Sequence, residues 1–509
     1  MPFNSIFAWM MKKRIHQIDL FRKYPEEVQH EMLETFVRMG ANTEYGNLHS
    51  FSEIKSYEDF KKIPLQTYED VKPYVDRLMN GEQGLLWPSE TKWFAKSSGT
   101  TSSRSKLIPV TKESLEECHY KGGKDLLAMY YDNHPNRKLY NGKHLIVGGS
   151  AEINQLSADS YFGDLSAIIV KNLPWWAEIR RTPSRDIALM SEWQEKIEQM
   201  AISTMKEDVY ILAGVPSWTM VLANRVLELS GKSNLKEVWP NLELFMHGGV
   251  SFEPYREQFK RLIPDPKMNY VETYNASEGF FGIQDQVESD EMLLMLDYGI
   301  FFEFIPMSTY DGVNSKDVIS IDDVEVGVNY AVVITTNAGL WRYILGDTIK
   351  FTSRIPLRFK ITGRTKSFIN IAGEEVIVEN AEKALSEACN KTNAQIREYT
   401  VGPIYMEEDE KGLHEWVIEF IRLPDEMERF CRILDEELRS VNSDYDAKRY
   451  YNMVLEKPVI HSVERGTFDI WLESIGKLGG QNKVPRLSND RTIVEQILRI
   501  VEEITNENA

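Results

Sequence analysis

A hydroxyl-rich segment offers the clearest chemistry in this chain. Residues 97–106 read Ser-Ser-Gly-Thr-Thr-Ser-Ser-Arg-Ser-Lys. A loop of this composition exposes backbone N–H groups that can form a concave anion site, and Lys106 adds a positive charge. We therefore predict a site for the phosphates of a nucleotide triphosphate, although a solvated Ser/Thr turn is the alternative interpretation. The residues predicted to contact the phosphates are Ser97, Ser98, Gly99, Thr100 and Thr101.

Polar groups also follow two predicted strands further along the chain. The first group is His247-Gly248-Gly249, and the second is Tyr274-Asn-Ala-Ser277-Glu278. In the second group, the aromatic ring could stack on a purine, the hydroxyl could contact a phosphate and the carboxylate could hold Mg²⁺. The alternative is a core tyrosine followed by a solvated glutamate. For His247 the sequence leaves two interpretations open: the side chain lines a pocket, or it has a structural role.

Later segments add further charged candidates. Gly339-Leu-Trp-Arg-Tyr-Ile-Leu-Gly-Asp347 ends in a carboxylate that could accept hydrogen bonds from ribose hydroxyls. A Gly-Asp pair is also an ordinary turn, so this segment alone decides little. The segments Gly363-Arg364-Thr-Lys366 and Asn482-Lys483-Val-Pro-Arg486 follow it.

The elements that must position these groups have an alternating pattern. From about residue 140, short apolar runs alternate with helical patterns, which predicts an α/β fold, and one helix begins at Pro216. In open α/β sheets, ligands bind just beyond the carboxyl ends of the strands. We therefore expect the two polar groups at one edge of a sheet. The predicted strands are 143–148, 209–213, 242–246, 268–273, 299–305 and 330–335.

The pattern changes beyond about residue 362. A helix with apolar positions within 377–388, a strand at 416–421 and a helix at 427–441 predict a smaller α+β domain. We therefore expect a large domain at 1–362 and a small one at 363–509, joined near 363–367.

Composition limits the possible partners. The chain has 509 residues and a formal net charge of −19, which disfavours nucleic-acid binding and polybasic membrane binding. The three widely spaced cysteines indicate reduced thiols and a cytoplasmic location. No apolar run reaches the roughly 20 residues of a membrane span, and the N-terminal basic cluster follows the apolar run, the reverse of a secretory signal.

In their order along the chain, these motifs resemble the adenylate-forming superfamily, which includes acyl-CoA synthetases and firefly luciferase. The resemblance is closest to its GH3 branch of acyl acid amido synthetases. It rests on Ser-Ser-Gly-Thr-Thr at 97–101, Tyr-x-x-Ser-Glu at 274–278 and Gly-Leu-Trp-Arg-Tyr-x-x-Gly-Asp at 339–347. Three departures are Ser103, where the branch often has glycine, Trp341, where it often has tyrosine, and the aliphatic rather than basic residues before Gly346-Asp347.

The resemblance implies a fold and a set of roles. The fold would be a large N-terminal adenylate-forming domain with mixed β-sheets and flanking helices, plus a smaller mobile C-terminal α+β domain. Residues 97–101 would wrap the β- and γ-phosphates of ATP, and Glu278 would hold Mg²⁺. Lys483 and Lys106 would stabilise charge on the phosphates. The other implied contacts are Gly248 and Gly249 at the adenine, Tyr274 on the base, Ser277 at the α-phosphate, Asp347 at the ribose, and Arg364 and Lys366 at the hinge.

The implied activity has two half-reactions. A carboxylic acid attacks ATP to give an acyl-adenylate and pyrophosphate, and the amine of an amino acid then displaces AMP. Thioester formation with coenzyme A is the main alternative, because the superfamily shares its first half-reaction. A protein that binds ATP or an acyl acid without turnover is the second alternative.

A different nucleotide-binding motif is excluded. Gly231-Lys232-Ser233 lacks the upstream glycine of a Walker A motif. A monomer is the expected oligomeric state.

Overall fold

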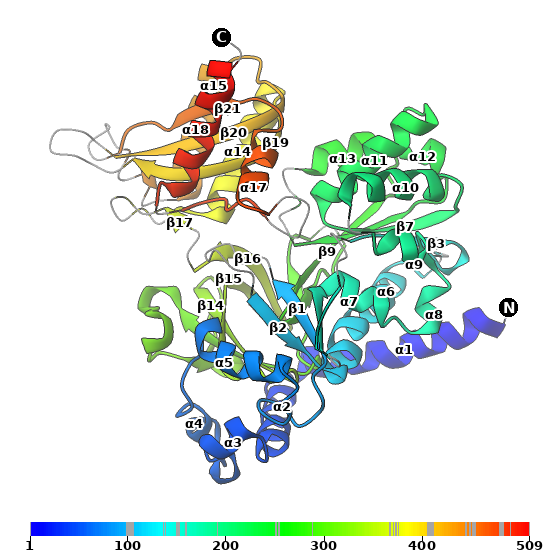
Figure 1. Cartoon of the computed structure of the whole chain (residues 1–509), viewed down its shortest axis with the longest axis vertical. Helices are drawn as coiled ribbons and strands as arrows, with labels where there is room; N and C mark the ends of the chain where they lie inside the picture. Colours follow the sequence, from blue (N-terminus) through cyan, green and yellow to red (C-terminus); the bar gives the residue numbers. More distant parts are fainter. Residues whose placement is uncertain are drawn as a thin grey trace. The chain divides into compact units, whose positions relative to one another are not determined.

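The computed structural model describes most of the chain. The described residues are 2–97, 106–135, 137, 139–148, 153–157, 160–190, 192–249, 252, 255–287, 289–365, 368–369, 371, 374, 376–404, 412–442, 445–446, 449, 455–477, 483–488 and 490–507. They form two compact units (Figure 1), which we describe separately. Of the described residues, the first unit holds those up to 345 and 349–360, and the second holds 346–348 and those from 361 onward.

A large mixed sheet forms the centre of the first unit. Among the described residues its strand order is β13-β12-β14-β15-β16-β11-β10-β9-β8-β7-β3-β6. The run from β6 to β9 is parallel, and β10 then turns back antiparallel on β9. The strand bounds are β3 Lys143–Val147, β6 Arg181–Thr182, β7 Val209–Gly214, β8 Leu244–Gly248, β9 Asn269–Ala276, β10 Gly279–Ile283, β11 Met292–Leu294, β12 Ile300–Pro306, β13 Ile319–Ser320, β14 Asn329–Thr336, β15 Tyr343–Arg354 and β16 Leu357–Arg364.

A smaller sheet packs against the large one in the same unit. Its order is β2-β1-β5-β4, with β1 antiparallel to β2 and parallel to β5. Its strands are β1 Trp93–Ser97, β2 Lys106–Val110, β4 Asn154–Ser157 and β5 Ser160–Asp164.

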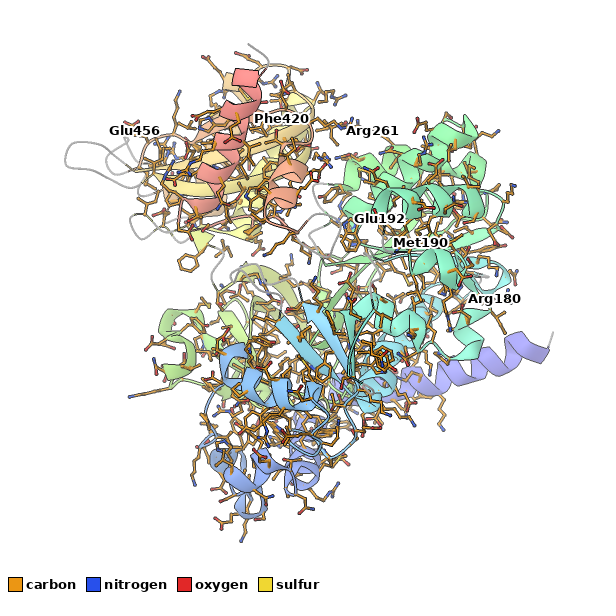
Figure 2. The ribbon with its side chains drawn as sticks, in the orientation of Figure 1. Arg180, Met190, Glu192, Arg261, Phe420 and Glu456 are labelled. Carbon is orange, nitrogen blue, oxygen red and sulfur yellow. The ribbon has the colours of Figure 1, made fainter. Side chains whose placement is uncertain are left out.

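Helices cover both faces of the parallel strands (Figures 1 and 2). Successive residues of a strand point to opposite faces, so Leu244 of β8 lies in the core shared with α6, α7 and the small sheet. Phe245 lies in the core shared with α10, α11 and α13. The helices of this unit are α1 Pro2–Lys23, α2 Pro25–Gly40, α3 Glu44–Leu48, α4 Tyr57–Phe60, α5 Tyr68–Met79, α6 Tyr120–Asn133, α7 Leu165–Lys171, α8 Trp175–Glu178, α9 Arg185–Ala188, α10 Trp193–Thr204, α11 Pro216–Ser230, α12 Leu235–Val238 and α13 Arg256–Leu262.

Local sequence explains the bounds of α11, the helix predicted from Pro216. Proline stands at its first turn, where the missing N–H costs nothing. The helix ends at Gly231, whose φ of 65° is left-handed. The Gly-Lys-Ser sequence at 231–233 is therefore the end of a helix, with Gly231 as its C-cap.

The second unit has its own sheet and core. Strand β20 pairs antiparallel with β19 and parallel with β21. Trp416 of β20 packs in the core shared with α14 and α15, whereas the adjacent Val417 packs in the core shared with α17 and α18. The bounds are β17 Phe368–Ile369, β18 Val376–Ile377, α14 Val378–Thr392, β19 Gln395–Ile404, β20 Leu413–Arg422, α15 Met427–Val441, β21 Val459–Val463, α17 Thr467–Ser474 and α18 Thr492–Glu507.

The architecture is mixed α/β, as predicted. None of the helices in the described part of the chain combines the length and apolar character that a membrane span requires.

Candidate active site

The β1–β2 hairpin frames the hydroxyl-rich segment. Ser97 is the last residue of β1 and Lys106 the first of β2, and the two are paired in the antiparallel register. The segment 98–105, including the predicted contacts Ser98, Gly99, Thr100 and Thr101, lies outside the described residues. The paired strand ends therefore fix where this segment leaves the sheet and where it returns.

Lys106 lies between two tyrosines. Its ammonium donates a hydrogen bond to Tyr343 Oη at 3.4 Å, and it lies 5.8 Å from the ring centroid of Tyr68 and 5.9 Å from that of Tyr343. Aromatic faces attract cations at this range. Tyr343 belongs to the 339–347 motif, so two motifs far apart in sequence meet in the first unit. Sequence reasoning assigned no role to either tyrosine; Tyr343 had a signal in its motif, whereas Tyr68 had none.

The backbone requires the two glycines at the carboxyl end of β8, Gly248 in the strand and Gly249 directly after it. Gly248 pairs with Thr273 of β9, and a Cβ at Gly248 would lie 2.3 Å from the Thr273 carbonyl oxygen. Gly249 has a left-handed φ of 83°, which side-chain-bearing residues rarely adopt. The chain therefore leaves the carboxyl end of β8 without a side chain at either position.

His247 precedes these glycines and is buried. Its ring stacks on Phe252 with centroids 4.0 Å apart. Burial, and secondarily the charge of Arg256, lower the pKa of His247 to about 3. The imidazole is therefore neutral at physiological pH, and its contacts support the structural interpretation.

Tyr274 is largely a core residue. Its side chain is 7% exposed and packs against Phe281 and Phe359, with ring centroids 4.8 and 6.0 Å away. The core interpretation therefore accounts for most of the ring, and only a small part of its surface is left to meet a base.

Ser277 and Glu278 form the turn between β9 and β10. Ala276 and Gly279 on either side of them are paired, so the connection is a two-residue hairpin. Ser277 is buried and Glu278 is half-buried. Because Gly248 lies beside Thr273 on the neighbouring strand, the two polar groups follow adjacent strands at the same sheet edge, as expected.

In the second unit, Asp347 and Arg364 form an ion pair. Arg364 Nε donates to Asp347 Oδ1 at 2.8 Å. The segments around them are joined by a backbone hydrogen bond, from Thr365 N–H to the Gly346 carbonyl at 2.9 Å, and by a side-chain hydrogen bond, from Thr362 Oγ1 to Thr348 Oγ1 at 2.8 Å. The predicted ribose ligand and the predicted hinge arginine are therefore neighbours. Lys366 lies outside the described residues.

Lys483, which is far from Asp347 and Arg364 in the sequence, interacts electrostatically with both. Crowding by the chain and the positive charge of Arg364 lower the pKa of Lys483 to about 8, whereas Asp347 acts in the opposite direction. The side chain of Lys483 is exposed, so water still hydrates part of the ammonium. Repulsion from Arg364 therefore accounts for a larger share of the lowered pKa than it would at a fully buried lysine. Three predicted residues, separated by up to 136 positions (483 minus 347), thus interact within one unit.

Family models match nearly the whole length of the chain. The GH3 family N-terminal domain matches residues 14–268, the central domain matches 293–364 and the C-terminal domain matches 379–492. The chain belongs to the GH3 family.

Two relatives from Arabidopsis thaliana illustrate the match in sequence. The 4-substituted benzoates-glutamate ligase GH3.12 is 24% identical to this GH3 protein, over 91% of this chain and 92% of the relative. The indole-3-acetic acid-amido synthetase GH3.6 is 23% identical, over 95% and 92%.

Two solved structures share the fold. The AtGH3.15 acyl acid amido synthetase in complex with 2,4-DB superposes with a TM-score of 0.78 at 20% identity, covering 96% of each chain. A 2-hydroxyisobutyryl-CoA ligase in the postadenylation state superposes with a TM-score of 0.59 at 13% identity, covering 94% of this chain and 91% of that one. These two structures confirm the predicted fold class.

Proposed function

We propose that this protein is an ATP-dependent acyl acid amido synthetase, which forms an acyl-adenylate and then an amide. The observation that carries the proposal is the ordered match of three GH3 domain models from residue 14 to residue 492. Relatives that align over more than nine-tenths of the chain are named as a benzoates-glutamate ligase and an amido synthetase.

In the first half-reaction, a carboxylate oxygen attacks the α-phosphorus of ATP and the bond to the bridging oxygen of pyrophosphate breaks. Residues 97–101 hold the β- and γ-phosphates, and the Lys106 ammonium stabilises the charge that builds on them. Support comes from the hairpin register, which sets Lys106 directly opposite Ser97 at the base of this segment. Gly248, Gly249, Tyr274 and Ser277 contact the adenosine and the α-phosphate from the edge of the sheet.

The residues present suit a magnesium ion bound together with ATP. Mg²⁺ in nucleotide enzymes is usually held by one or two carboxylates, substrate phosphates and water. Glu278 offers one half-buried carboxylate at the hairpin turn. Within the described ranges, no group of three or more His, Cys, Asp and Glu side chains forms a complete metal cage, so Glu278 and the phosphates would hold the ion. When bound, the ion would neutralise charge on the departing pyrophosphate.

The second unit supplies the remaining contacts. Asp347 accepts hydrogen bonds from the ribose, Lys483 stabilises phosphate charge, and Arg364 and Lys366 lie at the hinge. We place the domain boundary at 362/363, and the small domain changes its orientation between the half-reactions, which admits the acceptor and excludes water. The ion pair of Asp347 and Arg364 supports a shared role for these residues.

In the second half-reaction, the neutral amine of an amino acid attacks the acyl carbonyl carbon. The bond between this carbon and the AMP oxygen breaks, and the nitrogen loses a proton. The three free thiols, Cys118, Cys389 and Cys431, suit the reducing cytoplasm in which ATP and amino acids are available.

Product analysis tests the proposal. The protein is incubated with ATP, Mg²⁺, a panel of aromatic and aliphatic carboxylic acids, and either mixed amino acids or coenzyme A, and the products are identified by mass spectrometry. An acyl-amino acid together with AMP is the expected result. An acyl-CoA would assign the protein to thioester formation, and ATP binding without carboxylate-dependent pyrophosphate release would indicate a non-catalytic binding protein.

A further inference from the structure

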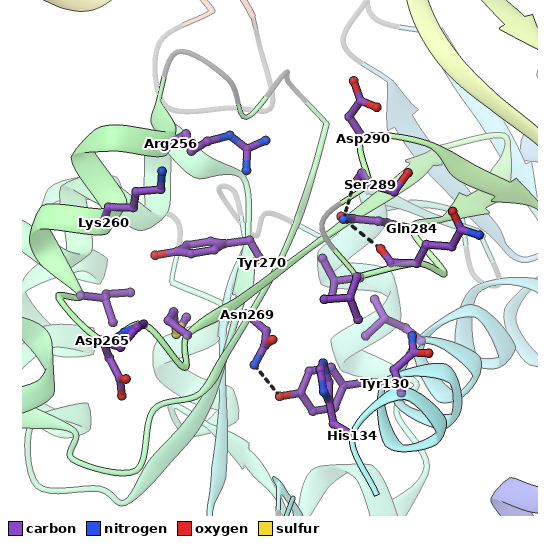
Figure 3. Close-up of a pocket in the computed structure, with 18 of the residues that line it drawn as sticks. Tyr130, His134, Arg256, Lys260, Asp265, Asn269, Tyr270, Gln284, Ser289 and Asp290 are labelled. Atoms are coloured by element: carbon purple, nitrogen blue, oxygen red, sulfur yellow. Dashed lines mark hydrogen bonds between the residues drawn. The ribbon is translucent and has the colours of Figure 1, made fainter. Parts of the chain in front are cut away.

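A pocket of about 680 Å³ opens in the first unit at the amino end of β9 (Figure 3). Strand β10 pairs with β9 only from Thr273 to Ala276, so the described strands leave residues 269–271 with an open edge on that side. The end of α6, helix α13 and the segment after β10 surround this edge. Its volume lies in the range of small-molecule sites.

The pocket is separate from the proposed nucleotide contacts. None of the site residues assigned above lines it. Tyr270, which does line it, precedes Tyr274 by four residues on the same strand, and a strand advances about 3.3 Å per residue, which separates their backbones by about 13 Å. Any ligand in this pocket therefore has its own set of contacts.

Two cations come from one face of α13. Arg256 and Lys260 both line the pocket and are one helical turn apart. Figure 3 shows both side chains on the same side of the pocket as the Tyr270 ring. The Arg256 guanidinium carbon lies 5.2 Å from the ring centroid of Phe252, and Lys260 pairs with the exposed Glu257 at 2.7 Å. This wall thus presents hydrogen-bond donors.

Tyr270 adds a donor that the protein does not use. Its ring stacks on Phe252 with centroids 5.2 Å apart, and within the described part of the chain its buried hydroxyl has no hydrogen-bond partner. Burial raises the pKa of Tyr270, so the hydroxyl stays protonated at neutral pH. A buried polar group without a partner is destabilising, and a small shift of the lining that uncovers this oxygen would let an acceptor on a ligand satisfy it.

The acidic groups of the lining are compensated. Asp265 pairs with Lys236 at 2.9 Å, and Asp290 pairs with Lys360 at 2.5 Å. Burial lowers the pKa of His134, which is neutral. The two carboxylates of the lining are therefore each paired with a lysine, and Lys260 is itself paired with Glu257 on the outer side of α13.

The wall formed by α6 is aromatic and apolar. The rings of Tyr130 and His134 lie 4.6 Å apart, and Tyr130 Oη already accepts a hydrogen bond from Asn269 at 2.9 Å. Leu126, Met268 and Val271 also line the pocket. These surfaces suit a ring or a short alkyl body.

We infer that this pocket is a second small-molecule site, which binds an organic oxyanion. The carboxylate or phosphate group lies on Arg256, Lys260 and the Tyr270 hydroxyl, and the apolar body lies against Tyr130 and His134. The inference does not depend on the proposed catalytic activity.

Calorimetric titration of the full chain without ATP tests the site. The probes are benzoate, phenyl phosphate and the neutral benzamide, and the variants are Tyr270→Phe and Arg256→Gln. The control is Arg261→Gln, because Arg261 is exposed on the same helix (Figure 2) and outside the lining. We expect one of the two anions to bind, with benzamide much weaker, and both pocket variants to lose about tenfold in affinity. Arg261→Gln should change the affinity less than twofold.

The two anions separate a carboxylate site from a phosphate site. Absence of binding by both anions, or binding that Tyr270→Phe leaves unchanged, would overturn the inference. Tyr270→Phe should fold at least as well as the parent, since the hydroxyl has no partner, so it decides the question even if Arg256→Gln is unstable. Amide formation by Tyr270→Phe, measured separately, should equal that of the parent; its failure in both proteins would count against the catalytic proposal alone.

Discussion

Arg342 lies in the middle of the 339–347 motif, yet its contacts are structural. Its side chain is 3% exposed and makes a bidentate ion pair with the fully buried Glu303, at 2.9 Å. It also donates to the carbonyl oxygens of Lys61 and Ile63 at 2.6 and 2.5 Å. Its φ of 44° is left-handed. Arg342 therefore fastens the segment after α4 to the sheet, close to the motif residues proposed for catalysis.

Replacing this arginine should be severely destabilising. Arg342→Met leaves the Glu303 carboxylate buried without its cationic partner, with only the hydrogen bond from Tyr57 Oη at 3.0 Å, and we expect a loss of about 3–5 kcal/mol in the free energy of unfolding. Urea denaturation measures it. The additional change Glu303→Gln should recover part of the loss, because it removes the buried charge. Arg38→Met, at an exposed arginine of α2, should cost less than about 0.5 kcal/mol. A loss below about 1 kcal/mol in Arg342→Met would contradict the structural role.

For Glu278 we expect the opposite: its substitution should reduce catalysis and leave the stability of the fold unchanged. Glu278→Gln keeps the size of the side chain at the hairpin turn and removes the charge proposed to bind Mg²⁺. Carboxylate-dependent pyrophosphate release should fall by about 100-fold or more, while the unfolding midpoint stays within error. Glu31→Gln, at an exposed position of α2, is the matched control. Retention of pyrophosphate release in Glu278→Gln would remove this residue from the site.

The charge of Lys483 should appear in the pH profile. The surrounding chain, which displaces part of its hydration, and then the charge of Arg364 lower the pKa of Lys483 to about 8, so the free protein loses the ammonium as the pH rises through this value. Because kcat/KM reports groups of the free enzyme, kcat/KM for ATP should fall above about pH 8. Lys483→Arg keeps its charge and should move this decline to higher pH. Arg364→Gln removes a repulsion and should shift it in the same direction. A decline that is identical in all three proteins would assign it to another group.

At the scale of the element, adjacent glycines in α6 provide a matched pair. A Cβ on Gly122 would lie 2.6 Å from the Phe280 ring, whereas one on Gly123 would meet nothing within 4 Å. Phe280 lies in β10, two residues after Glu278. Gly122→Ala should therefore destabilise the protein by about 1–3 kcal/mol through overpacking, and Gly123→Ala should stabilise it by about 0.5–1 kcal/mol. Urea midpoints compare the two directly. Equal effects would show that helix propensity, not the contact with β10, decides both.

The sequence predicted strands that consist of one continuous apolar run and helices that have one apolar face. The strand expected at 209–213 is β7, and the helices expected from 216 and at 427–441 are α11 and α15. The strand expected at 242–246 lies at Leu244–Gly248. The apolar Leu242 extends the predicted strand towards its N-terminus, since this residue is fully buried although it precedes the strand. Burial alone therefore does not mark where pairing begins.

Long-range pairing was beyond the reach of sequence pattern. Strand β15 extends over Tyr343–Arg354 and is not among the predicted strands, although Ile349 and Phe351 alternate with Lys350 and Thr352 in the sequence. The contact of Lys106 with Tyr343 joins residues 237 positions apart (343 minus 106). Motif order indicated which residues matter, whereas only the folded chain shows which of them touch.

At the scale of the whole molecule, the second unit should fold by itself. Its two core clusters surround one sheet and include the buried Trp416 and Trp471. The fragment 361–509 keeps both clusters and, of the unit's described residues, loses 346–348. The ion pair of Asp347 with the partly exposed Arg364 contributes at most about 1 kcal/mol. A domain of about 150 residues buries enough surface to be stable.

We therefore expect fragment 361–509 to unfold cooperatively in urea and to show the near-ultraviolet circular dichroism of fixed tryptophans. Within the fragment, Leu434→Ala removes a fully buried side chain and should cost about 2–5 kcal/mol. Leu423→Ala, at a residue that is 60% exposed, should change little. A fragment that binds a hydrophobic dye and lacks the near-ultraviolet signal would be a loosely packed state, which would mean that the core of this unit depends on the rest of the chain. Cooperative unfolding that responds to Leu434→Ala and not to Leu423→Ala would instead locate the unit's stability in its own interior.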